Sequence, residues 1–207
     1  MFGDFDEERT PCPTKAQLPL LRHLTLDPFY TPQAELLFSN VQMPALNSLC
    51  ICVGGHTRFS SFFDIGWPLF PHLRTLSISA PESEDLDDSA VHLYSVEPLL
   101  DCMPVLHSLK LRYLGDRWDG IVSALHRQAC GLQKLEIEDC AIRLEDLVSI
   151  FHLRGLGSKS AIGHFAIRRC QHIPSEVRPR LEKLCDKLEW ESYWEGDVEE
   201  LWGQFAI

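Results

Sequence analysis

The sequence predicts an α/β solenoid: a curved parallel sheet with one strand per repeat and with helices and loops on its convex side. The first observation behind this prediction is the stretch CGLQKLEIEDCAI, which begins at Cys130 and fits the spacing L-x-x-L-x-L-x-x-C-x-L with isoleucine at two apolar positions. Leu135 and Ile137 are two residues apart, which suits a short strand that points both side chains inward. This spacing is the unit pattern of a leucine-rich repeat.

The second observation is that the pattern recurs. Six apolar triplets share the L-x-x-L-x-L spacing, the last of them loosely, and their first residues are 25, 27, 33, 26 and 30 residues apart. The first four triplets each follow a proline by two residues. Chance does not repeat so many positions at once, so we expect six to seven irregular repeats. The triplets are Leu21-Leu24-Leu26, Leu46-Leu49-Ile51, Leu73-Leu76-Ile78, Leu106-Leu109-Leu111, Leu132-Leu135-Ile137 and Ile162-Phe165-Ile167, and the prolines are Pro19, Pro44, Pro71 and Pro104.

The chain is expected to form one elongated domain, because a repeat array grows by stacking. With 207 residues, 45% of them hydrophobic, it can bury a core. Residues 1–17 mix acids, threonine and proline and are expected to form a mobile N-terminal arm. Residues 18–190 are the expected repeat domain. Residues 191–207 are expected to form an acidic, tryptophan-containing C-terminal tail that caps the last repeat.

Further elements follow from periodicity and capping residues. A short strand is expected at each triplet, beginning with residues 23–27, and a final strand is expected at residues 188–190. Two helices are indicated by apolar residues at i, i+3, i+4 and i+7, from Trp118 to Leu125 and from Leu144 to Phe151. Gly155 is expected to end the second of these. Shorter helices are expected over residues 32–38, after Ser95, and from Ser175 to Leu184.

Charge and cysteine usage restrict the possible partners. The net charge of −11 repels both phosphate backbones and anionic lipids, and no dense basic patch offsets it, so neither nucleic acid nor a membrane is an expected partner. No apolar run approaches the ~20 residues of a membrane span, and the opening MFGDFDEERT does not resemble a secretory signal. The eight cysteines are scattered without C-x-x-C spacing, which indicates reduced thiols in a cytoplasmic or nuclear protein.

The sequence gives little support for catalysis, a metal or a cofactor. Glycine-rich phosphate loops, G-x-S-x-G and H-E-x-x-H are absent. His126 with Cys130, and Cys170 with His172, could each bring two metal ligands together, but no second pair completes either set. The acidic loop at residues 81–88 lacks the glycine and closing glutamate of a calcium loop. We therefore expect a protein that is not an enzyme and that binds neither metal nor cofactor.

Two cysteines add a resemblance to a known family. Cys140 stands at the ninth position of its repeat, and Cys170 stands three residues after Ile167, where a thiol can fill the turn and donate weakly to a carbonyl. These thiols, the M-P-x-L-x-x-L-x-L phrasing and the closing R-P-x-L-E-K-L followed by a tryptophan-bearing strand resemble the leucine-rich-repeat region of fungal F-box/leucine-rich-repeat proteins. The resemblance covers roughly residues 18 to 190.

In that family an N-terminal F-box docks to the Skp1-type adaptor of a cullin ubiquitin ligase, and the repeats hold the substrate. Residues 1–17 are too short and too polar to form an F-box. The resemblance therefore implies a protein–protein interaction module, the substrate-recognition part of an F-box-type receptor, with the adaptor bound through an upstream segment missing from this sequence. The alternative is a structural or self-associating repeat protein with no ligase role.

The partner is expected on the concave face, where the residues between the inward leucines project. Early repeats present small side chains there, and later repeats present charges of alternating sign. Complementary charges on neighbouring strands can set partner choice, although the face could also be merely solvated. Because such exposed pairs stabilise folding little, replacing Lys110 and Arg112 with glutamate should weaken the binding of a genuine partner and leave the melting temperature nearly unchanged. The expected partner-binding residues are Lys110, Arg112, Lys134, Glu136, Glu138 and Arg168.

Overall fold

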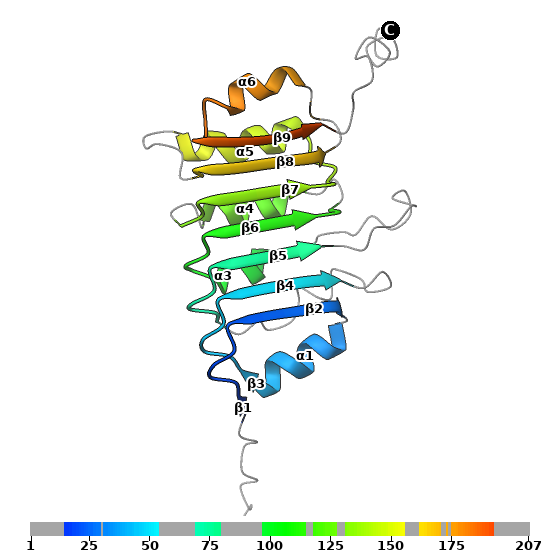
Figure 1. Cartoon of the computed structure of the whole chain (residues 1–207), viewed down its shortest axis with the longest axis vertical. Helices are drawn as coiled ribbons and strands as arrows, with labels where there is room; N and C mark the ends of the chain where they lie inside the picture. Colours follow the sequence, from blue (N-terminus) through cyan, green and yellow to red (C-terminus); the bar gives the residue numbers. More distant parts are fainter. Residues whose placement is uncertain are drawn as a thin grey trace, which may run out of the picture.

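The protein is a mixed α/β structure built around one large parallel sheet of seven strands (Figure 1). The computed structural model describes residues 15–29, 31–53, 69–79, 97–114, 118–127, 131–155, 162–170, 173 and 175–192. Several expectations lie outside these residues: the arm up to residue 14, the acidic loop at 81–88, the cap at Ser95 and the tail beyond residue 192.

The strands of the large sheet follow one another in sequence order, and every neighbouring pair is parallel. Leu24, Leu49, Leu76, Leu109 and Leu135 are paired in register from strand to strand, followed by Phe165 and Leu188. This order confirms the expected strand positions and their succession. The strands are β2 (His23–Phe29), β4 (Ser48–Val53), β5 (Thr75–Ser79), β6 (Ser108–Arg112), β7 (Lys134–Glu138), β8 (His164–Cys170) and β9 (Lys187–Ser192).

The recurring prolines occupy a turn before each early strand. In all four turns the residue before proline accepts a backbone hydrogen bond from the first leucine of the triplet, as Met43 O does from Leu46 N at 3.1 Å and Met103 O from Leu106 N at 3.2 Å. Proline fits the second position of such a turn because its ring fixes φ near the value required. The repeated proline therefore favours the turn that places the first leucine of the triplet in the core.

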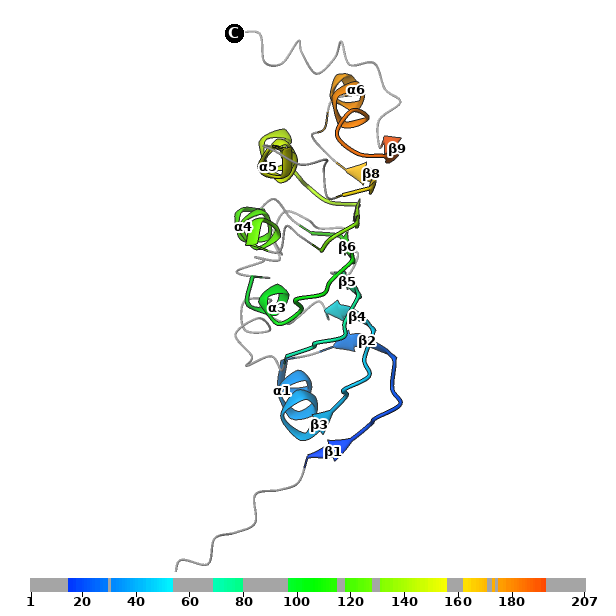
Figure 2. The ribbon, with the colours of Figure 1, turned by 90° about the vertical axis from the view of Figure 1, so that its left-hand side faces the viewer.

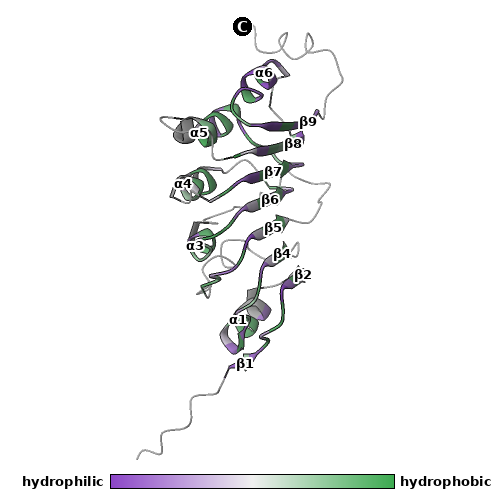
Figure 3. Cartoon of the chain, turned by 60° about the vertical axis from the view of Figure 1, so that its left-hand side comes forward, coloured by the Kyte–Doolittle hydropathy of each residue, from purple (hydrophilic) through white to green (hydrophobic). Residues whose placement is uncertain are grey.

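Five helices among the described residues lie on one side of the large sheet (Figure 2). Figure 3 shows the hydrophobic residues of α4 and α5 on the sides of these helices that face the strands. The core lies between the two layers, where the leucines of the triplets are almost wholly buried. No helix in the described ranges is both long and apolar enough to cross a membrane. The helices are α1 (Thr31–Asn40), α3 (Glu97–Asp101), α4 (Asp119–Arg127), α5 (Leu144–Gly155) and α6 (Arg178–Leu181).

The two periodic helices form as the sequence predicts, with one adjustment. The expected stripe of α4, from Trp118 to Leu125, is buried at all four positions, and α5 ends at Gly155. In α5, however, Leu147, Ile150 and Phe151 are the buried residues, whereas Leu144 is half-buried. The buried face of α5 is thus rotated relative to the expected stripe. Phe151 explains this rotation, because its ring packs edge-on against the ring of Phe165 in β8, with centroids 4.8 Å apart.

The last expected helix is wrong in length. Residues 175–177 form a 3-10 turn, and α6 has only four residues, so the element from Ser175 to Leu184 is not one helix. Leu181 is buried, but Leu184 is 40% exposed and does not extend the apolar face. The chain then enters β9, as expected from the alternation around Trp190.

The N-terminal end of the sheet differs from the expected arm and is open on its outer side. Ala16–Gln17 forms β1, which pairs in parallel with β3 (Val41–Gln42), so the last residues assigned to the arm belong to the fold. Leu24 and its neighbours in the first triplet are only half-buried, whereas Leu49 of the next strand is fully buried. Leu20 is 88% exposed and Leu36 is 68% exposed. This end therefore presents uncovered apolar surface among the described residues.

Cys140, two residues after β7, and Cys170, the last residue of β8, occupy equivalent positions in their repeats. The Sγ atom of Cys140 contacts the carbonyl oxygens of Glu138 at 3.1 Å and of Leu111 at 3.6 Å, and that of Cys170 contacts Ile137 O at 3.5 Å. Leu111 and Ile137 are register partners, so both thiols make the same contact with the preceding strand. This confirms the expected role of a thiol that donates to a carbonyl as the chain leaves the strand.

We predict that these two thiols are inert in the folded protein. Burial raises the pKa of Cys140, and burial raises the pKa of Cys170 to about 11, so the reactive thiolate is scarce at both positions. Iodoacetamide labelling read by peptide mass spectrometry should modify half-buried Cys50 in the native state and modify Cys140 only after unfolding. Equal native labelling rates at Cys50 and Cys140 would contradict the assignment.

Candidate functional site

The candidate site lies on the sheet face that points away from the helices, called the open face below. Because side chains alternate along a strand, the buried leucines of each triplet point to the helices and the residues between them point to the opposite side. Parallel register aligns these residues into rows that run across the strands. One row contains Thr25, Cys50, Ser77, Lys110, Glu136, Ala166 and Glu189, and a second contains Cys52, Ser79, Arg112, Glu138, Arg168 and Glu191.

The open face divides into a small neutral half and a charged half. On β4 and β5 the residues that point to the open face are cysteine and serine, and they are partly buried. Burial raises the pKa of Cys52; a hydrogen bond with Ser79 lowers it, and a hydrogen bond with Asp27 raises it further. On β6 to β9 the same rows carry lysine, arginine and glutamate. The charged half begins at Lys110 and Arg112.

Glu138 is the centre of the charged half. Its carboxylate lies 2.7 Å from Lys110 Nζ, 3.2 Å from Arg112 Nε and 2.7 Å from Arg169 Nη2. The Arg112 contact is an ion pair without hydrogen-bond alignment, whereas Arg169 donates a hydrogen bond. Glu138 is only 8% exposed, so three cations on two neighbouring strands, β6 and β8, surround one buried carboxylate. Removing these cations would leave a costly buried charge.

Glu136 forms a second centre beside it. It pairs with Lys134 on its own strand and lies 3.6 Å from Lys110 Nζ and 3.7 Å from Arg168 Nη1. Together these two carboxylates connect all six residues predicted from the sequence into one network, the charged cluster. Its members are Lys110, Arg112, Lys134, Glu136, Glu138 and Arg168.

The network continues beyond the predicted residues to β9. Arg168 donates to Glu189, which also pairs with Lys187 and lies 3.0 Å from His164 Nε2. Hydrogen bonds from Lys187 and Arg168 lower the pKa of Glu189 to about 2. The hydrogen bond with Glu189 raises the pKa of Arg168 above its ordinary value. The charged half is thus continuous across four strands.

Arg169 and Asp139 are important residues that the sequence did not single out. Tyr113 and Asp139 directly follow β6 and β7, and Arg169 is the penultimate residue of β8; their φ values are positive, at 55°, 52° and 49°. The left-handed turn brings Arg169 over the preceding strand, where it makes hydrogen bonds of 2.7 and 2.8 Å with the Asp139 carboxylate. Asp139 immediately precedes Cys140, and Arg169 immediately precedes Cys170, so the two residues hold equivalent positions in neighbouring repeats. This equivalence was the one sequence signal that could have identified them.

The structure also corrects the expectation that these ion pairs are exposed. The side chains of Glu136 and Glu138 are 13% and 10% exposed, whereas those of Lys110 and Arg112 are 31% and 34% exposed. The cations lie over the carboxylates and separate them from solvent. Replacing Lys110 and Arg112 with glutamate would crowd like charges around a buried carboxylate, so the melting temperature should fall.

For Glu136 and Glu138, the neighbouring cations lower the pKa by more than burial raises it. Burial raises the pKa of Glu136, but the Lys134 hydrogen bond and the charges of Lys134, Lys110 and Arg168 leave it below its ordinary value. Burial likewise raises the pKa of Glu138, and Lys110, Arg112 and Arg169 bring it below its ordinary value. Both groups are therefore ionised near neutral pH.

The arrangement suits recognition by charge. Within the described ranges, no group of three or more histidine, cysteine or acidic side chains could hold a metal ion. Comparison with protein-family models, with curated proteins and with solved structures finds no match to this chain. The distinctive group on the open face is the charged cluster, a set of cations held over two carboxylates.

We predict that Glu138→Gln lowers the free energy of unfolding by about 2 kcal/mol at pH 7, because three cations lose their shared carboxylate. Chemical denaturation measures the change. The control is Glu191→Gln, which alters the same charge at a side chain that is 54% exposed and contacts Arg169 at 3.4 Å. The control should change the free energy by less than about 0.5 kcal/mol. Equal effects of the two variants would refute the central role of Glu138.

We also predict a loss of stability in acid. The folded-state pKa values of Glu136 and Glu138 lie below the ordinary value of 4.5, so their contribution is present above pH 4.5 and is lost as the pH falls through the lowered values. Thermal unfolding followed from pH 7 to pH 3 should show a steep fall at the acid end. The double variant Glu136→Gln/Glu138→Gln should be less stable at pH 7 and show a shallower fall; an unchanged slope would count against the assignment.

Proposed function

We propose that the chain is a leucine-rich-repeat solenoid and that its open face binds a protein partner through the charged cluster. The sequential parallel strands, the repeated proline turns and the equivalent thiol contacts support the solenoid assignment. The observation that carries the function is the open face, since the described helices lie on the opposite side of the sheet (Figure 2). Such a face holds its side chains in fixed rows about 4.8 Å apart.

The distribution of exposure indicates the chemistry of the partner. The cations of the charged cluster are 30% to 39% exposed, from Arg168 to Lys134, whereas Glu136 and Glu138 are nearly covered. A partner would therefore meet mainly positive charge over β6 to β8. At β9 the exposed groups are acidic, because Glu191 is 54% exposed. This polarity favours a partner that places acidic groups over β6 to β8 and a basic group near β9.

The narrower proposal is that this face recognises the substrate of an F-box-type ubiquitin ligase. The turn thiols of Cys140 and Cys170 support it, because they occupy the positions on which the resemblance depends. A Skp1-type adaptor would then bind through a segment upstream of the repeats. Co-purification of the longest natural gene product with a Skp1-type adaptor tests this reading, and no association would remove the ligase role while leaving protein binding intact.

A second candidate is a self-associating repeat protein, favoured by the N-terminal end. Leu18 is 44% exposed, Leu20 is 88% exposed and Leu36 is 68% exposed; the first two lie between β1 and β2, and Leu36 lies in α1. Light scattering over a range of concentrations separates the candidates. A stable dimer that loses affinity on Leu20→Ser would favour self-association, and a monomer at high concentration would favour a different partner.

We predict that partner binding depends on the open face and not on the helical side. The variant Lys134→Gln/Arg168→Gln removes two partly exposed cations, and Arg180→Gln/Lys183→Gln removes two exposed cations from α6 and the turn that follows it. Affinity purification with quantitative mass spectrometry should retain the partner on the wild-type chain and on the helical-side variant, and lose it on the open-face variant. Circular dichroism confirms that both variants fold. Retention of every partner by the open-face variant would contradict the proposal.

A further inference from the structure

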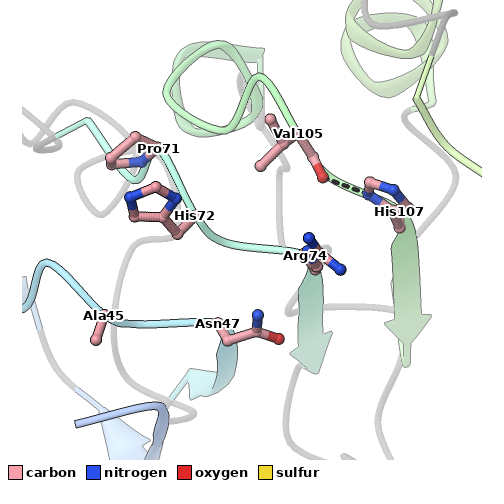
Figure 4. Close-up of a pocket in the computed structure, with 7 residues that line it drawn as sticks. All are labelled: Ala45, Asn47, Pro71, His72, Arg74, Val105 and His107. Atoms are coloured by element: carbon pink, nitrogen blue, oxygen red, sulfur yellow. Dashed lines mark hydrogen bonds between the residues drawn. The ribbon is translucent and has the colours of Figure 1, made fainter. Parts of the chain in front are cut away.

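A second surface lies at the edge of the sheet where the chain enters the strands, and it is independent of the open face. Here three successive repeats enclose a groove of about 400 Å³ (Figure 4). Each repeat contributes one residue from its proline turn and one residue just before its strand. The turn residues are Ala45, His72 and Val105, and the residues before the strands are Asn47, Arg74 and His107.

The main chain under the groove is fixed by hydrogen bonds on both sides of Arg74. Its N–H donates to Asn47 O at 2.8 Å, and its carbonyl accepts from His107 N and Ser108 N, both at 2.9 Å. Pro71 restricts the preceding turn, in which Leu73 N donates to Phe70 O at 3.3 Å. The backbone position from which the Arg74 side chain projects is therefore set before any ligand arrives, and such preorganisation reduces the entropic cost of binding.

The groove presents hydrogen-bond donors and positive charge without a carboxylate in its lining. Arg74 supplies a guanidinium, Asn47 an amide, and His72 and His107 supply imidazoles. The Nδ1 atom of His107 donates to the Val105 carbonyl oxygen, which leaves its Nε2 atom for a ligand (Figure 4). Arg74 is exposed and forms no ion pair with any described carboxylate.

The lack of a carboxylate in the groove lining contrasts with the charged cluster. In the charged cluster every lysine and arginine contacts glutamate, and the whole chain carries a net charge of −11. At the strand-entry edge, by contrast, the residues immediately before the first five strands include no acid: Arg22, Asn47, Arg74, His107 and Gln133. A guanidinium without a carboxylate partner matches the geometry of a carboxylate or phosphate group through two parallel hydrogen bonds.

The shape of the groove indicates a peptide. It extends across three repeats, and two spacings of about 4.8 Å between neighbouring strands give a length of roughly 10 Å, equal to about three residues of extended chain. Its volume of about 400 Å³ lies in the range of pockets that enclose a ligand group. A nucleic acid fits poorly, because its backbone would be repelled by the acidic chain on either side of one arginine.

We propose that the strand-entry groove binds an extended peptide segment of a partner protein and that Arg74 holds an anionic side chain of that segment, either a carboxylate or a phosphate. Asn47 and His72 contact the same group, and His107 contacts the flanking residue. The proposal does not depend on the open face, so a test can refute either binding site without affecting the other.

Fluorescence anisotropy with three labelled peptides tests the proposal. The peptides alternate alanine with glutamate, phosphoserine or glutamine. The glutamate or phosphoserine peptide should bind, and the glutamine peptide should bind at least about tenfold more weakly. Preference between the two acidic peptides distinguishes carboxylate from phosphate, and competition by inorganic phosphate supports the latter. Equal binding of the glutamine peptide, or equal competition by a single-stranded oligonucleotide, would overturn the proposal.

Arg22 offers a matched control, because it is an exposed arginine at the equivalent position of the first repeat and does not line the groove. Arg74→Gln should weaken peptide binding about tenfold or more, and Arg22→Gln less than about threefold. Arg74→Lys keeps the charge but loses the two parallel donors and should fall between them. Amide chemical-shift changes should concentrate at Asn47, Arg74 and His107. Equal losses for Arg22→Gln and Arg74→Gln would show only a net-charge effect and overturn the assignment.

Discussion

The fold depends on one backbone interaction that is repeated at the start of each strand. The carbonyl of the residue before a strand accepts N–H groups from the next repeat, two at each of the first four junctions and one at the last two: Arg22 O, for example, accepts from Asn47 and Ser48 at 2.8 and 3.0 Å, and Gln133 O accepts from His164 at 3.0 Å. This contact fixes the register in which neighbouring strands begin. A slip by one residue would turn every core leucine toward solvent, so the hydrophobic core and the register enforce each other.

The same register determines the electrostatics of the open face. Lys110 is paired opposite Glu136, and Arg112 is paired opposite Glu138. Long cationic side chains can therefore extend over the shorter carboxylates of the neighbouring strand, and they bury those carboxylates without the help of another layer. Burial raises the pKa of each carboxylate, but the cations around it lower that pKa by more, so the net shift is downward. The cluster is thus both a structural element and an exposed surface.

The sequence predicted the parts of the structure that are set by local spacing. The triplets locate the strands, the prolines locate the turns, and the alternation places all six predicted charges on one face. Two features could not be read in this way. The burial of Glu138 depends on side chains from the two neighbouring strands, and the position of Arg169 depends on a left-handed backbone conformation that its residue type does not favour. The last helix was overextended because Leu181 and Leu184 continue a helical spacing that the chain abandons after residue 181.

The two surfaces should differ in how they use charge. Each cation of the charged cluster contacts a carboxylate, so its long-range field is partly offset, and an acidic partner gains from these charges mainly at close range. Arg74 has no described carboxylate beside it, and its field is therefore opposed only by the distributed net charge of the chain. Such a field is screened over about 8 Å at physiological ionic strength. Per cation engaged, binding at the strand-entry groove should consequently be more sensitive to salt than binding at the open face, since Arg74 has no described carboxylate beside it.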